Sequence, residues 1–179
     1  VEEDVKNAVE SVTRENPIAA YAVDTISWEL GTNNGQSAVA VNISYIHDQT
    51  DIRKIRTVKD MDAAKDMIGT QLNQCAAGVV LFLENYEDTD FVQVVEDYAF
   101  RNPQAVMETP EVTANIYPEN GSSRVVELKF SYQNSRDALR SMRSEVSPVF
   151  AAAALYVSGD AKDYEKFSQL YSFLMERHD

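Results

Sequence analysis

Hydrophobic residues recur with helical spacing in two stretches of the chain, 2–17 and 88–103, and each stretch ends in an Asn-Pro pair. The spacing i, i+3, i+4, i+7 is typical of an amphipathic helix that buries one face. Proline disfavours the α conformation in the residue before it, so both helices are expected to end at the asparagine. The apolar positions are Val5, Ala8, Val9 and Val12 in the first stretch and Phe91, Val94, Val95 and Tyr98 in the second.

Each Asn-Pro pair is followed by two alternating segments around an Asn-Gly dipeptide, a pattern that predicts a β-hairpin. The strands are expected at 22–30 and 39–45, and again at 111–117 and 126–132. Asn34-Gly35 and Asn120-Gly121 tolerate the positive φ of a tight turn. Alternation predicts one apolar face, formed by Val39, Val41, Ile43 and Tyr45 and by their counterparts Val126, Leu128, Phe130 and Tyr132, and a water-facing side with Asn42, Ser44, Glu127, Lys129 and Ser131.

The same order of helix, proline and hairpin therefore occurs twice, and both Asn-Pro pairs align. We interpret this as an internal repeat, with chance similarity as the alternative. The expected fold is α+β, with two related helix/β-hairpin units, a helix-strand insertion between them and C-terminal helices. Residues 1–87 would form the first unit with its insertion, and residues 88–179 the second unit with the C-terminal helices.

The insertion begins with a capping residue, Asp60, and continues as a helix expected over 60–74. Gly78 then introduces a short apolar run that predicts a buried strand over 78–84. Residues 52–58 fit either a strand or a helix. The apolar stripe of the helix expected over 60–74 consists of Met61, Ala64, Met67, Ile68 and Leu72.

Two helical patterns follow the second hairpin. One helix starts at Ser135, with Ala138, Met142 and Val146 on one side, and Pro148 predicts either a kink or two abutting helices. The last helix is expected over 161–176 and should dock on the preceding Ala-rich helix or on a hairpin face. We expect its stripe to be core, with one wall of a ligand groove as the alternative; the stripe is Tyr164, Phe167, Leu170, Tyr171 and Leu174.

The net charge of the chain limits the kinds of molecule that it is expected to bind. The 179 residues include 16 basic and 29 acidic ones, a formal net charge of −13, which repels phosphate backbones and argues against a nucleic-acid partner. No apolar run reaches the roughly 20 residues that span a bilayer. The first ten residues lack the basic and apolar regions of a signal peptide, and a chain that begins at Val1 leaves open what precedes it.

Cys75 is the single cysteine, which excludes an internal disulfide and a multi-thiolate metal site. A cysteine nucleophile requires a histidine base, and the two histidines, His47 and His178, lie in no catalytic motif. Small apolar neighbours after Cys75 offer nothing to lower its pKa. We therefore expect a buried or half-buried structural cysteine.

An acidic run before the second repeated helix, Glu84, Glu87, Asp88 and Asp90, could hold a hard cation. It lacks the glycine and the distal glutamate of a calcium loop, and we expect it to cap the helix instead. Trp28, the single tryptophan, is expected in the core beside Ile26 and Leu30. No residue is assigned as catalytic, cofactor-binding or metal-binding, and no cofactor is expected.

From Ser122 to Asp179 the order of features resembles a known family. A strand ending in "KFSY" leads to a charged, alanine-rich helix, "RDALRSMRSEV" with "AAAAL", and then to "SGDAKDYEKFSQLYSFLMERHD". This order is similar to the region upstream of the catalytic core in bacterial (Firmicutes-type) secreted transglutaminase-like proteins. In that family the helix ends near a Tyr-Asp pair, where this chain reads "RHD", and the nucleophilic cysteine follows later.

The resemblance implies an accessory region without the catalytic core. The family's Cys-His-Asp triad has no matching positions here, and Cys75 lies upstream of the similar region. We expect a non-catalytic, extracytoplasmic interaction or scaffold module with a protein or cell-envelope partner, extracellular or attached to the envelope, while a cytoplasmic location stays open. The alternatives are a hydrolase with a carboxylate site between the two units and a solute-binding module.

Overall fold

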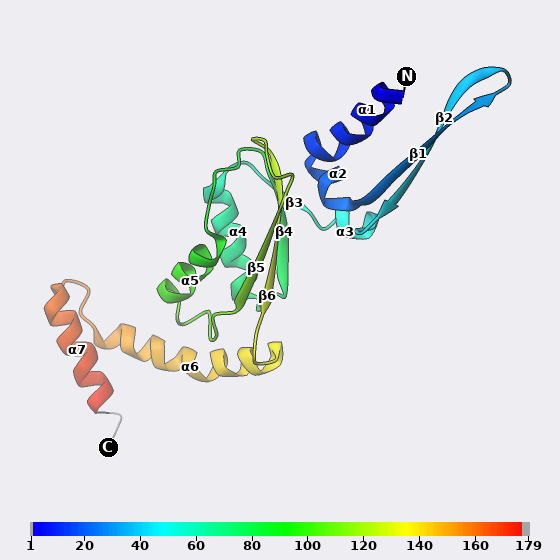
Figure 1. Cartoon of the computed structure of the whole chain (residues 1–179). Coiled ribbons are helices and arrows are strands. Elements are labelled where there is room, and N and C mark those ends of the chain that lie inside the picture. Colours follow the sequence, from blue (N-terminus) through cyan, green and yellow to red (C-terminus); the bar gives the residue numbers. More distant parts are fainter. Residues whose placement is uncertain (1, 177–179) are drawn as a thin grey trace.

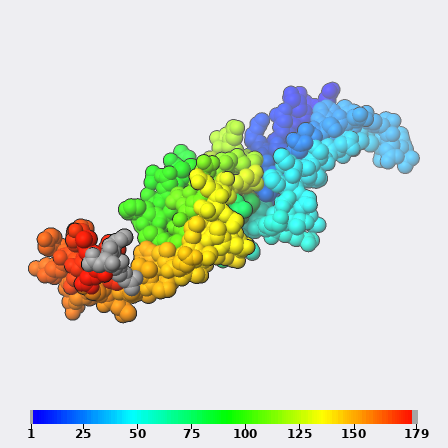
Figure 2. Space-filling model, turned by 90° about the horizontal axis from the view of Figure 1, so that it is seen from below, coloured from blue at the N-terminus to red at the C-terminus, as the bar shows by residue number. Residues whose placement is uncertain are grey.

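The computed structural model describes residues 2–176, which form an elongated α+β molecule (Figures 1 and 2). A helix and a hairpin project at the N-terminal end, a mixed sheet with helices forms the central body, and two helices form an arm at the C-terminal end. The helices are α1 (Glu2–Glu15), α2 (Pro17–Ala22), α3 (Gln49–Ile52), α4 (Met61–Asn73), α5 (Phe91–Arg101), α6 (Arg136–Tyr156) and α7 (Asp163–Met175). The strands are β1 (Val23–Asn33), β2 (Gln36–Tyr45), β3 (Arg56–Val58), β4 (Gly78–Leu83), β5 (Glu111–Tyr117) and β6 (Arg124–Ser131).

The central body is built on a four-stranded sheet with the order β3-β4-β6-β5. β6 pairs antiparallel with both neighbours, and the short β3 runs parallel to β4. Helices α4 and α5 cover one face of the sheet (Figure 1). Residues 58–83 and 91–130 contribute to the same hydrophobic core, so the predicted segments 1–87 and 88–179 meet in one sheet and one core.

Local sequence signals explain why α4 and α5 form where they do. The carboxylate of Asp60 accepts a hydrogen bond from the Ala63 N–H at 3.0 Å, and Asp90 caps α5 in the same way. The predicted helix 60–74 and strand 78–84 are confirmed as α4 and β4, and the predicted stripe of α4 packs in the core. For residues 52–58 the sequence had left strand and helix as alternatives. In the structure residue 52 ends α3, and residues 56–58 form β3.

The other face of the sheet is covered by a helix that the sequence pattern did not indicate. The predicted strand 22–30 was expected soon after Pro17, but Pro17 begins α2. Proline suits the first turn of a helix, and the Asn16 side chain accepts bonds from the Ile18 and Ala19 N–H groups, both at 3.0 Å. Asn16 therefore ends α1 and caps α2. Tyr21 and Ala22 of α2 pack on Val125 of β6.

Both predicted hairpins are present, but their turns differ. Asn34 (φ 53°) and Gly35 (φ 78°) form the expected tight turn between β1 and β2. In the second hairpin, residues 118–123 separate the two strands. Of the pair Asn120-Gly121, only Gly121 has a positive φ (111°). The tight second turn is therefore a wrong prediction, because a longer connection that starts with a cis Tyr117-Pro118 bond closes this hairpin.

The surroundings of the two hairpins also differ. Val126, Leu128 and Phe130 are buried in the core as predicted, whereas their counterparts on β2 are exposed, because β1 and β2 form a sheet by themselves. Trp28 is half-buried beside an exposed Leu30, so its core position is wrong. Glu127 was predicted to face water but is 7% exposed, because α2 and α3 pack over its side of the sheet.

The C-terminal arm begins at α6, which the Ser135 side chain caps. α6 continues through Pro148, so the reading as two abutting helices is wrong. The backbone carbonyl that proline leaves without a donor lies on an exposed stretch of α6, where water can reach it. α7 then folds back on α6, as predicted, through the buried Phe173 and the ring of Tyr156.

Candidate functional site

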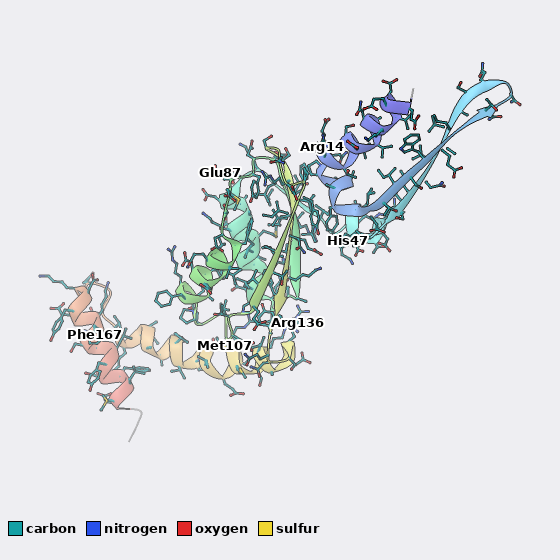
Figure 3. All side chains as sticks on the ribbon, in the orientation of Figure 1. Arg14, His47, Glu87, Met107, Arg136 and Phe167 are labelled. Atoms are coloured by element: carbon teal, nitrogen blue, oxygen red, sulfur yellow. The ribbon has the colours of Figure 1, made fainter. Side chains whose placement is uncertain are left out.

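The structure does not bring the candidate nucleophile Cys75 and the candidate base His47 together. Cys75 is half-buried at the end of α4, as predicted, where Arg136 of α6 donates a hydrogen bond to the neighbouring Gln74 carbonyl at 3.0 Å. His47 lies beside α3, and its ring stacks on Tyr21 with 4.0 Å between the centroids. Figure 3 shows Arg136 and His47 in different parts of the molecule. His178 lies outside the described residues.

One residue of the acidic run before α5, Asp90, caps that helix. Asp90 accepts hydrogen bonds from Val92 (3.0 Å) and Gln93 (3.1 Å) as the cap of α5, which is the predicted reading. Asp88 accepts a bond from the Tyr86 hydroxyl, and Glu84 and Glu87 are exposed. Between residues 2 and 176, no group of three or more His, Cys, Asp or Glu could hold a metal ion.

A polar cluster around the buried Glu127 lies between the sheet and helix α2. The Glu127 carboxylate accepts a hydrogen bond from Asn115 at 3.0 Å and contacts the Lys129 ammonium at 3.3 Å. Tyr21 and Tyr117 meet edge to face nearby, with 5.7 Å between ring centroids. Burial, together with smaller contributions from the charges of Glu127 and Asp51, raises the pKa of Tyr21 to about 12. The neutral phenol of Tyr21 is therefore the form that this cluster favours.

The raised pKa values of two tyrosines predict that the protein becomes less stable at high pH. The pKa of Tyr21 is raised from 10.0 to about 12 by burial, and burial also raises that of Tyr132 to about 12. A group whose pKa is higher in the folded state contributes its full stabilisation below the unfolded pKa and loses it as the pH rises through the folded pKa. We expect the free energy of unfolding, measured with urea, to fall between pH 10 and about 12.

Matched tyrosine variants separate this effect from general alkaline damage. Tyr21→Phe should flatten part of the fall, whereas Tyr171→Phe should leave it unchanged because Tyr171 is 57% exposed. The absorbance of tyrosinate should show late-titrating groups among the nine tyrosines. Titration of all of them together near the ordinary pKa of 10.0 would contradict the prediction.

The C-terminal arm carries the largest set of exposed apolar side chains. Tyr164, Phe167 and Tyr171 of α7 are 80%, 68% and 57% exposed, so the prediction that this stripe is core is wrong. The reason is that α7 contacts α6 through the neighbouring face, where Phe173 is 7% exposed. Between the two helices lies an apolar groove of about 520 Å³, lined by Val149, Phe150, Ala153, Ala154, Val157, Leu170, Phe173 and Leu174. Soluble proteins rarely leave such a surface without a partner.

Comparison of the chain with protein-family models, with curated proteins and with solved structures found no match. Among the described helices, none combines the length and the apolar character needed to cross a membrane. Two features of the described residues stand out: an exposed apolar face on α7 and a polar cluster around the buried Glu127. Amphipathic periodicity had indicated the apolar stripe of α7 but had predicted it in the core, whereas the burial of Glu127 depends on helix α2 and had no local signal.

Proposed function

We propose that this chain is a non-catalytic, extracytoplasmic interaction module that docks a protein partner on helix α7. The observation that carries the proposal is the exposure of the apolar face of α7. Tyr164, Phe167 and Tyr171 recur at helical spacing, and an apolar helix face of this kind is a common binding surface for a protein. A position at one end of the elongated molecule leaves that face accessible (Figure 3, where Phe167 is labelled).

The partner that we propose is a transglutaminase-like catalytic core. The resemblance of residues 122–179 to the region upstream of such a core supports this choice, and in that arrangement α7 would couple the accessory region to the enzyme. Aromatic side chains at the centre of an interface often contribute most of the binding energy. The half-buried, separated Cys75 and His47 support a role without catalysis of its own. We also propose that the two helix/β-hairpin units are related by an internal repeat. These units would hold the C-terminal arm in place.

The experiment that tests this function mixes the chain with a separately produced bacterial transglutaminase-like core that has its own Cys-His-Asp triad. Calorimetry should detect association, and the mixture should show acyl transfer that the isolated chain lacks. The absence of association would contradict the proposed partner. Turnover of glutamine-amide or peptide substrates by the isolated chain, lost in Cys75→Ala, would overturn the non-catalytic role and favour a hydrolase.

A further inference from the structure

A hollow of about 330 Å³ at the edge of the central sheet gathers basic side chains on an otherwise acidic chain. Lys54 precedes β3, Arg56 begins β3 and Lys129 lies on β6, so three separate segments supply the positive charge. The remaining lining comes from Gln71, Ala77, Leu128, Glu127 and the backbone of β4. This hollow is far along the chain from α7, and its role stands independently of the proposed function.

The hollow exists because β3 is shorter than β4. β3 pairs only with Leu81–Leu83, so Gly78 and Val80 extend beyond the first residue of β3. The Ala77 carbonyl accepts a bond from the Phe130 N–H of β6 at 2.8 Å. Since backbone groups alternate along a strand, Gly78 directs its N–H and its carbonyl to the opposite edge, toward the hollow.

The absent side chain of Gly78 allows close packing of β4 on β6. A Cβ at this position would lie 2.3 Å from the Leu128 carbonyl oxygen, closer than any real contact. Glycine therefore lets β4 lie close against β6, and the outer edge of residue 78 is left open because β3 pairs only with Leu81–Leu83. An uncovered strand edge is a ready template for another extended segment.

The charges around the hollow are not equally free to bind a ligand. Lys54 is 2.8 Å from Asp51, and Lys129 is 3.3 Å from Glu127, so each lysine already has an acidic neighbour. Arg56 makes no ion pair with any residue between 2 and 176, and its guanidinium is suited to a bidentate carboxylate. A ligand with one carboxylate near Arg56 would therefore complement the site.

We propose that this hollow binds an extended acidic peptide segment, which pairs its backbone with Gly78 and places a carboxylate against Arg56. A peptide fits better than a small inorganic anion, because it satisfies both the N–H and the carbonyl of Gly78, whereas an anion has no donor for the carbonyl. The volume of about 330 Å³ suits a short segment of a partner and not a folded domain.

The test uses the isotopically labelled chain and a blocked hexapeptide that alternates glutamate and valine. Titration followed by NMR should shift the amide signals of Gly78 and Val80, and the binding should weaken with added salt. The same peptide with glutamine in place of glutamate should bind about tenfold more weakly or worse.

Two charge reversals make the result specific. Arg56→Glu should lower the affinity by about tenfold or more, while Lys59→Glu, the same change on an exposed residue outside the hollow, should change it by less than about threefold. The spectrum of each variant verifies that it is folded. Equal effects of the two reversals, equal binding of the glutamine peptide, or equal shifts with inorganic phosphate would each overturn the proposal. Loss of α7 docking would leave this experiment unaffected.

Discussion

Leu128→Ala should lower the free energy of unfolding of the central body by about 2–5 kcal/mol. Leu128 is 1% exposed on β6, the strand that pairs with β4 on one side and β5 on the other. Its side chain points into the core under α4 and α5, so truncation leaves a cavity where these elements meet. Because domains are stable by only about 5–15 kcal/mol, a loss of this size is a large fraction of the total.

A matched control is available on α6. Leu155→Ala removes the same atoms from a side chain that is 90% exposed, so it should change stability by no more than about 0.5 kcal/mol. Urea unfolding followed by circular dichroism measures both variants. Equal effects of the two substitutions would show that β6 is not the centre of the core.

Tyr171→Asp is expected to weaken association with a transglutaminase-like core by at least about 30-fold, the effect of losing a hot-spot aromatic of about 2 kcal/mol. The charge would have to be buried against an apolar partner, which costs free energy unless the partner supplies a counter-charge. The isolated chain should unfold at nearly the same urea concentration as the wild type, because Tyr171 is 57% exposed.

Tyr45→Asp is the control for this second variant. Tyr45 is the last residue of β2, at the base of the N-terminal hairpin, and is 61% exposed, so both variants place the same charge in similar exposure. Calorimetric titration of each variant with the core should distinguish them. A strong effect at Tyr45 and none at Tyr171 would place the docking surface on the hairpin, against the proposed role of α7.

Elements with strong local signals were predictable from the sequence. Asp60 marks the start of α4, Gly78 marks the start of β4, and Asn34-Gly35 closes the first hairpin. Helix α2 was missed because six residues are too few for a periodic pattern. Pro17 had been interpreted as a stop for the helix before it, although proline equally suits the first turn of the next helix.

The periodicity of apolar residues did not predict which elements pack on each face of β6 and of α7. Alternation placed Glu127 on the side of β6 opposite the core, which is correct, but helix α2, which packs on that side, is distant in sequence. Helical spacing gave the apolar face of α7, whereas the structure shows that Phe173 faces α6 and Tyr171 does not. A pattern identifies an apolar face, and only the three-dimensional arrangement shows whether another element buries it.

The position of β6 between β4 and β5 has a consequence for synthesis on the ribosome. β6 is the last of the four strands in sequence, and both β4 and β5 find their antiparallel partner in it. While the nascent chain ends before residue 124, the apolar β4 has only the three residues of β3 beside it. Unpaired apolar strands of this kind are prone to aggregate or to be held by chaperones. Folding of the central body during translation therefore waits for β6, and a stalled or truncated product that ends before it would be cleared as an unfolded chain.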